Sequence, residues 1–221
     1  MGRISTGSNN LDKCLGGGFE SGIITELYGE PGSGKTNVII STLKKVLESG
    51  KAILIDTEGI SWERVSQVGI RKENLSNLKY ARVKNYDEQV ELVGKLKPLI
   101  LMEGKVDLIV VDNLTTFYRY ERERRAELRK KIGNSLYYQL EILQSISNEL
   151  DIPVIITNQV YYGKNTSDIQ PLGGEGISHA AKAIFKINKL QEGRRELEVI
   201  KHRSLPEGLK CPFKITNAGI E

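Results

Sequence analysis

A glycine-rich octapeptide is the clearest chemical signal in the sequence. Residues 29–36 match the phosphate-binding pattern G-x-x-x-x-G-K-[ST] at every defined position. Glycines let backbone N–H groups converge on phosphate oxygens, and the start of a following helix adds favourable partial charge. Lys35 can neutralise the β- and γ-phosphates, and the Thr36 hydroxyl can ligate Mg²⁺. The pattern predicts a site for ATP and Mg²⁺ built from Gly29, Glu30, Pro31, Gly32, Ser33, Gly34, Lys35 and Thr36.

Two acidic residues at the ends of apolar runs can complete a hydrolytic site. Asp112 ends the run 108–112, and Glu58 follows the run 53–55. The carboxyl ends of parallel strands share one rim of a sheet, where the glycine-rich loop also lies. We expect Asp112 to hold Mg²⁺ through a water molecule, and Glu58 to act as general base or to position the attacking water. The alternative for both acids is a capping role at a strand end.

The elements that must position these residues follow an alternating pattern. Short apolar runs alternate with amphipathic stretches of helix length, which is typical of a mostly parallel sheet. We expect strands at 23–28, 52–56, 78–83, 108–112 and 152–158, and helices at 35–48, 87–103 and 125–149. Further strands at 183–190, 196–202 and 212–216, joined by tight turns, should add antiparallel to one sheet edge. The pattern predicts an α/β fold in one domain, residues 1–221, with helices on both faces of the sheet.

The charge is unevenly distributed along the chain. The net charge of the 221 residues is only +4, but residues 119–131 and residues 182–210 each carry a local +4. Two basic segments on an otherwise mildly acidic protein are compatible with nucleic acid as a partner. Solvated charged faces are the alternative.

The cysteines and the apolar runs bear on the compartment. Cys14 and Cys211 have no CxxC spacing, so we expect two free thiols in a reducing environment and assign them no role. No apolar run approaches the length of a membrane span. We expect a cytoplasmic protein with no membrane partner.

Several stretches resemble the RecA-type strand-exchange recombinases of archaea and eukaryotes. The resemblance covers essentially the whole chain and lies in residues 4–8, 11–12, 16–18, 56–59, 62–64, 118–128, 156–160, 173–174 and 179–180. It implies a RecA-like P-loop ATPase core in which Glu58 is catalytic, Arg64 stacks on adenine and Gln159 senses the γ-phosphate. It also implies that residues 118–128 form a first DNA-facing loop and that a second opens after Gln159. The glycine-rich stretch 163–176 is too long for an ordinary connection and fits that second loop.

The chain departs from full recombinases by starting directly at the ATPase core, without an N-terminal helical DNA-binding domain. In this it resembles the core-only RadB group of archaeal paralogues. That resemblance argues against long filaments and autonomous strand exchange. It implies weak ATPase activity, DNA binding, and assistance to the main recombinase RadA in homologous recombination and DNA repair.

Candidate DNA contacts come from three segments. Arginines interleave with Tyr118 and Tyr120, and such a mixture binds phosphates and stacks on bases without reading sequence. We therefore expect salt-sensitive binding that prefers single strands. Lys201-His202-Arg203 is open to three interpretations: a K-x-R pair reaching ATP in a neighbouring subunit, a basic hairpin on DNA, or a solvated strand end. The candidates are Arg119, Arg122, Arg124, Arg125, Lys164, Lys201, His202 and Arg203.

Two other functions compete with the recombination hypothesis. One is a fast DNA-dependent motor ATPase. The other is a KaiC-like signalling ATPase, which would form a homo-oligomer and have no affinity for DNA.

Overall fold

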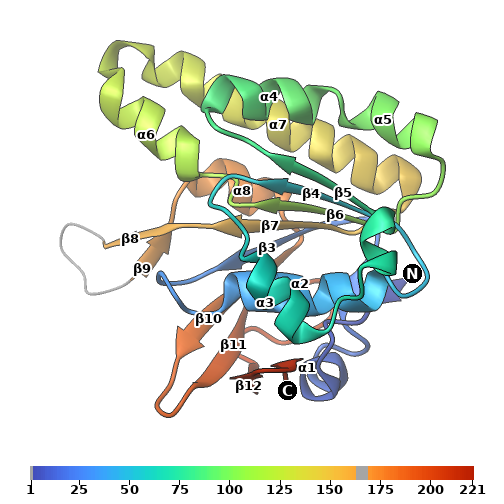
Figure 1. Cartoon of the computed structure of the whole chain (residues 1–221). Coiled ribbons are helices and arrows are strands. Elements are labelled where there is room, and N and C mark those ends of the chain that lie inside the picture. The colour runs from blue at the N-terminus through green and yellow to red at the C-terminus, as the bar shows by residue number, and fades with distance from the viewer. Residues whose placement is uncertain (1, 163–168) are drawn as a thin grey trace.

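A nine-stranded sheet forms the centre of the protein (Figure 1). The computed structural model describes residues 2–162 and 169–221. The sheet contains β3 (Ile24–Tyr28), β4 (Ala52–Asp56), β5 (Leu78–Arg82), β6 (Leu108–Asp112), β7 (Val154–Asn158), β10 (Ala183–Lys189), β11 (Arg194–Lys201), β12 (Lys210–Thr216) and β13 (Gly219–Ile220). Their order is β13-β12-β11-β10-β3-β7-β6-β4-β5. Two small sheets pair β1 (Arg3–Ile4) with β2 (Phe19–Glu20), and β8 (Val160–Tyr162) with β9 (Ile169–Pro171).

The strands from β10 to β5 in this order run parallel, whereas β11, β12 and β13 are antiparallel. Every residue of β3, β4, β6 and β7 is buried, which explains why these strands are continuous apolar runs rather than alternating ones. The predicted fold class, α/β with C-terminal antiparallel strands, is confirmed. The first of the strands expected to add antiparallel, β10, instead runs parallel to β3. The parallel arrangement brings the carboxyl ends of β3, β4, β6 and β7 to one rim.

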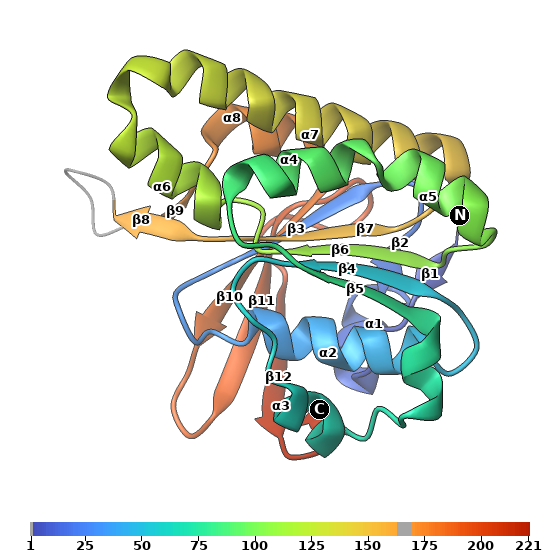
Figure 2. The same cartoon turned by 45° about the horizontal axis from the view of Figure 1, so that its top comes forward.

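Helices cover both faces of the sheet, as Figures 1 and 2 show. They are α1 (Asn9–Cys14), α2 (Lys35–Val46), α3 (Trp62–Val68), α4 (Tyr86–Gly94), α5 (Leu96–Glu103), α6 (Thr116–Arg124), α7 (Arg129–Leu150) and α8 (Gly174–Ala180), with short 3₁₀ turns at Glu73–Asn77 and Ala126–Leu128. One face packs on α1, α2 and α3, and the other on α4 to α8; each has its own apolar cluster. Among the described residues, no helix is long and apolar enough to cross a bilayer.

Two expected elements differ from the observed ones. The helix expected at 87–103 is two helices that meet at Lys95. Pro98 has no N–H to donate to the Gly94 carbonyl, so a continuous helix would lose a hydrogen bond there. The segment 118–128, expected as a DNA-facing loop, instead lies mostly in α6 and the 3₁₀ turn that follows it.

The expectation of two free thiols is wrong, because Cys14 and Cys211 form a disulfide. Their Cα atoms are 6.0 Å apart, although 197 positions separate them in the sequence. Cys14 ends α1, and Cys211 lies fully buried in β12. The bond therefore ties the first helix to the C-terminal strands.

Candidate functional site

The glycine-rich loop joins the buried strand β3 to α2 and is shaped for an anion. A Cβ at Gly29 would lie 2.5 Å from the Ile187 carbonyl oxygen, so only glycine fits there. Lys35 Nζ donates to the Gly29 and Glu30 carbonyls at 2.9 and 3.2 Å. Burial lowers the pKa of Lys35, while Glu58 and Asp112 raise it. A buried ammonium among backbone N–H groups is a fit for bound phosphates.

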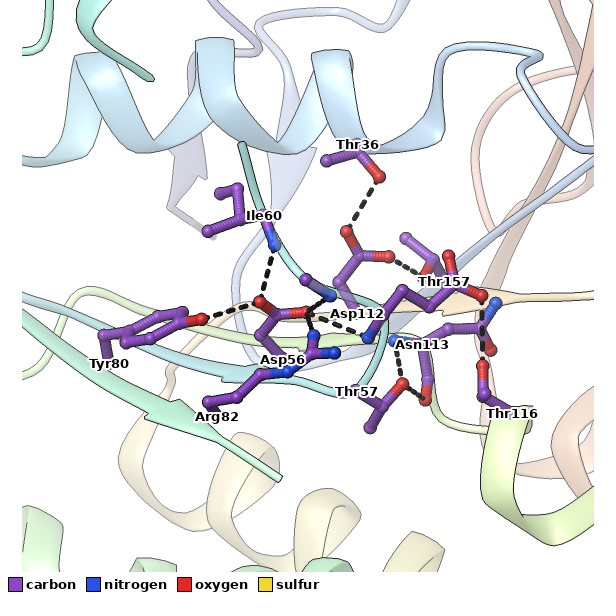
Figure 3. Close-up of polar contacts among 12 residues, drawn as sticks. Thr36, Asp56, Thr57, Ile60, Tyr80, Arg82, Asp112, Asn113, Thr116 and Thr157 are labelled. Atoms are coloured by element: carbon purple, nitrogen blue, oxygen red, sulfur yellow. Dashed lines mark hydrogen bonds and ion pairs between the residues drawn. The ribbon is translucent and has the colours of Figure 1, made fainter. Parts of the chain in front are cut away.

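The side of the loop facing β6 offers oxygen donors. Thr36 Oγ1 donates to Asp112 Oδ2 at 2.9 Å, and the Thr157 hydroxyl donates to the other Asp112 oxygen (Figure 3). Burial raises the pKa of Asp112, whereas the two hydroxyl hydrogen bonds lower it. A hydroxyl and a carboxylate at one point suit Mg²⁺, which prefers oxygen ligands and keeps several waters. Thr157 is a partner that sequence reasoning missed.

Asp56 holds the turn that carries Glu58. Its carboxylate accepts from the backbone N–H groups of residues 58–60 at 3.0, 2.7 and 2.7 Å (Figure 3). It also accepts from the Tyr80 hydroxyl at 2.8 Å and from Arg82 Nη1 at 3.0 Å. Of the two acids at this strand end, Asp56 therefore holds the turn in place, and Glu58 takes no part in these contacts through its side chain.

Glu58 accepts hydrogen bonds from two residues that lie shortly after the ends of β6 and β7. Its Oε1 accepts from Gln159 Nε2 at 2.8 Å and from the Thr116 hydroxyl at 3.0 Å. Gln159 immediately precedes β8, and Thr116 is the first residue of α6. The residues expected to be catalytic and to sense the γ-phosphate are therefore in direct contact.

Glu58 and Gln159 line one cavity of about 340 Å³ together with the glycine-rich loop. We name it the nucleotide cavity, after the ligand that the loop sequence predicts. Asn37, Arg119 and Val160 complete its wall. Arg119 was expected on DNA, but the first turn of α6 turns it toward this cavity. Its Nε lies 3.8 Å from Glu123 Oε1.

Arg64, implied to stack on adenine, is fixed by hydrogen bonds. Its Nε donates to Asn37 Oδ1 at 2.8 Å, and its Nη2 to the Thr216 carbonyl at 2.6 Å. Because Asn37 lines the nucleotide cavity, the guanidinium lies next to it. Adenine stacking stays a prediction.

The other arginines expected on DNA lie on or just after α6. Arg122 Nη1 donates to the Tyr118 hydroxyl at 2.9 Å, and Arg125 pairs with Glu121 at 3.1 Å. Arg124 is exposed at the last residue of the helix. Lys164 lies outside the described residues.

Lys201, His202 and Arg203 each contact other parts of the chain. Lys201 Nζ donates to the carbonyls at the end of α8, and Arg203 donates to Glu20 Oε1 at 2.8 Å. The His202 side chain is 2% exposed and stacks on Phe185, contrary to the expected DNA contact. Burial lowers the pKa of His202, and neighbouring Glu20 opposes this. Of the three side chains only that of His202 is buried, whereas Lys201 is half-buried and Arg203 is exposed.

Two cations beside the glycine-rich loop were missed. Arg195 Nε donates to the Ser33 carbonyl at 2.9 Å, and a Cβ at Gly32 would lie 3.5 Å from Lys189 Nζ. Both belong to the basic segment 182–210, so the local excess of positive charge was the sequence feature that could have indicated them. The register between β10 and β11 decides which cations of this segment lie beside the glycine-rich loop, because it pairs Arg195 with Lys189 at the loop end of the hairpin.

A buried polar chain continues behind the site. Asn158 Nδ2 donates to Glu26 Oε1 at 2.6 Å and to the Leu172 carbonyl at 2.7 Å, and Asn158 Oδ1 accepts from the Thr115 hydroxyl at 2.6 Å. Burial raises the pKa of Glu26 to about 7, although Asn158 and Lys201 lower it. Asn158 therefore ties the end of β7 to the segment leading into α8.

Glu26→Gln is expected to stabilise the protein above pH 7 and to have no such effect near pH 4.5. Because the folded protein holds the Glu26 proton more tightly than the unfolded chain, ionisation costs stability as pH rises from 4.5 to about 7. The cost reaches about 3 kcal/mol of the free energy of unfolding. Urea unfolding at pH 5 and pH 8 measures it. A pH-independent difference between variant and wild type would contradict the assignment.

Comparisons with known proteins agree with this architecture. The Rad51 family model matches residues 1–221. The DNA repair and recombination protein RadB of Thermoplasma acidophilum is 38% identical over 99% of this chain and 93% of its own length. The proteins of the same name from Archaeoglobus fulgidus and Methanococcoides burtonii are 37% and 36% identical, over 99% and 95% of this chain and 97% and 93% of their own lengths. This chain belongs to the Rad51 family.

Proposed function

We propose that this chain is an ATP-binding protein of homologous recombination and DNA repair that binds single-stranded DNA, hydrolyses ATP slowly and assists the main recombinase RadA. Family membership and relatives named DNA repair and recombination protein RadB support this role. The main structural support for this proposal is the contact of Glu58 with Gln159 and Thr116.

That contact joins the nucleotide cavity to both candidate DNA segments. Thr116 starts the helix that presents the arginines, and Gln159 starts the segment leading into β8. A group bound at the glycine-rich loop lies beside Glu58 and Gln159, which line the same cavity. A change at the γ-phosphate position can therefore shift the starts of both segments, and so alter DNA affinity.

The chemistry of each side chain in the nucleotide site suggests its role. Lys35 and the backbone of residues 29–36 would bind the phosphates, and Thr36 with Asp112 would hold Mg²⁺, which supplies charge neutralisation at the phosphates. Glu58 would orient and deprotonate water. Gln159 would contact the γ-phosphate, so that the presence of this phosphate changes the position of β8. Arg119, on the wall of the same cavity, is available to developing negative charge.

The alternatives have less support. A KaiC-like or motor ATPase with a K-x-R pair acting between subunits needs Lys201 and Arg203, and both donate hydrogen bonds within the chain. The relatives named above are repair and recombination proteins. We place the protein in the cytoplasm, as expected for a protein of recombination and repair. Size-exclusion chromatography with light scattering would test for a homo-oligomer and a RadA complex.

Removing three charges from the α6 region tests DNA binding. The triple variant of Arg122, Arg124 and Arg125 to alanine is expected to bind a labelled single strand about 100-fold more weakly at 0.1 M salt. Each phosphate contact on a single strand adds about 0.7 to the log–log salt slope, so the slope should fall by about 2. Fluorescence anisotropy across a salt series measures both quantities.

A matched control removes three exposed cations from the opposite face, Lys45, Arg71 and Lys72. This variant loses the same net charge, so it reports any effect of overall charge alone. Equal losses in the two triple variants, or unchanged binding by the α6 variant, would contradict a DNA surface on α6.

A further inference from the structure

A second cavity, of about 470 Å³, opens between α6, α7 and the segment that leads into α8. We name it the tyrosine pocket. Its walls include Tyr118, Arg122, Tyr137, Tyr161, Leu172 and Glu175, and none of its lining residues lines the nucleotide cavity. The volume falls within the range of about 300–1,000 Å³ that is usual for small-ligand sites.

Two aromatic rings give the tyrosine pocket exposed flat surfaces. The side chains of Tyr137 on α7 and Tyr161 on β8 are 53% and 48% exposed. Exposing apolar ring surface to water forgoes the gain from burying it. Aromatic rings at the surface of nucleic-acid-binding proteins serve as stacking platforms for bases.

The position of Tyr137 depends on a glycine in the neighbouring helix. A Cβ at Gly176 would lie 2.8 Å from Tyr137 Cε1, so the ring rests directly against the backbone of α8. Gly176 is itself buried. The Tyr137 ring thus packs against the backbone of α8 and also lines the tyrosine pocket.

The charged groups set which part of a nucleotide would enter. Arg122 is held by its hydrogen bond to the Tyr118 hydroxyl, and its guanidinium carbon lies 5.4 Å from that ring's centroid. Glu175 is exposed at the pocket wall. A carboxylate repels phosphate but accepts a hydrogen bond from a base amino group. Within the pocket, Glu175 therefore favours a base and Arg122 favours a phosphate.

We infer that the tyrosine pocket takes one unpaired nucleobase of a DNA strand, stacked against Tyr137 and Tyr161, with Arg122 on an adjoining phosphate. The inference rests on the proposed DNA-binding function and names one contact within it. Tyr161 follows Gln159 by two positions, and Arg122 shares α6 with Thr116. The pocket is therefore built on the two segments that Glu58 bonds, which makes it responsive to the nucleotide site.

Replacing Tyr137 tests the inference with its neighbour as control. Tyr137→Ala is expected to weaken binding of a mixed-sequence single strand by about 5- to 150-fold, the range for one stacked base. The salt slope should not change, since no charge is removed. Tyr137→Phe keeps the ring and should bind like wild type. Tyr138→Ala removes an equally exposed ring that faces Gly94 on α4 instead, and should also bind like wild type.

A strand built of tetrahydrofuran abasic sites separates base from backbone contacts. Wild type and Tyr137→Ala should bind it equally, because it offers phosphates but no base to stack. Wild-type binding of the mixed-sequence strand with no loss in Tyr137→Ala would overturn the pocket assignment and leave the proposed function standing. Absence of wild-type binding to that strand would overturn the proposed function itself.

Discussion

Glu58→Gln is expected to slow ATP hydrolysis by about 10²–10⁴-fold while ATP binding stays within a few-fold of wild type. Glutamine keeps the shape of the side chain and an oxygen that can accept from Gln159 and Thr116. It cannot take a proton from water, so only the chemical step should suffer. Because basal turnover is expected to be slow, single-turnover hydrolysis of radiolabelled ATP is the suitable measurement, with a fluorescent ATP analogue for binding.

Glu63→Gln is the matched control for this change. Glu63 is an exposed acid in the first turn of α3, five positions later, and it does not line the nucleotide cavity. It should hydrolyse ATP like wild type. Hydrolysis by the Glu58 variant at a rate close to wild type would remove Glu58 from the chemistry and return it to the role of a strand-end acid.

Loss of the disulfide is expected to lower the free energy of unfolding by about 2–5 kcal/mol. The bond closes a loop of 197 positions, and long closed loops restrict the unfolded chain most. For a chain of this size the corresponding fall in Tm is about 2–4 °C for each kcal/mol. Thermal unfolding of the Cys14→Ser, Cys211→Ser double variant, beside wild type with and without reductant, measures the effect.

Two internal checks accompany this measurement. Reductant should lower the Tm of wild type toward that of the double variant and leave the variant unchanged. Alkylation of the unfolded wild-type chain without reductant should label neither cysteine. If both cysteines are labelled and the Tm of wild type equals that of the double variant, the two thiols are free, as their spacing in the sequence suggested.

Features carried by neighbouring residues were predictable from the sequence. The conformation of residues 29–36 could be predicted from these residues alone, because glycines at fixed spacing between a strand and a helix leave the loop few possible conformations. The ends of β4 and β6 were equally readable, since continuous apolar runs stop at Asp56 and Asp112. The expected closeness of Asp112 and Thr36 is seen as a hydrogen bond between them, and their binding of magnesium stays a prediction.

Features that depend on register and helix orientation were not predictable in this way. The basic segment 182–210 was recognised, yet the sequence does not say which of its cations lie beside the glycine-rich loop. The hairpin brings Arg195 to the glycine-rich loop and turns Lys201 toward the end of α8. Likewise, Arg119 belongs to the arginine-rich segment, but the start of α6 directs it to the nucleotide cavity.

Contacts between distant segments were the least accessible. No spacing rule links Cys14 to Cys211, because their proximity arises only when α1 packs on the C-terminal strands. The tyrosine pocket draws its walls from α6, α7 and β8 and depends on Gly176 in α8. In sequence, Tyr137 is an ordinary aromatic residue on an amphipathic helix.

Binding of labelled single-stranded DNA across a salt series, with no nucleotide, with ADP and with a non-hydrolysable ATP analogue, tests the central claim most directly. The account predicts a steep salt dependence and an affinity that differs between nucleotide states by about 5- to 150-fold, the usual range of coupling between two sites. Absence of binding at low salt, or identical affinity in all three states, would contradict a nucleotide-gated DNA-binding protein.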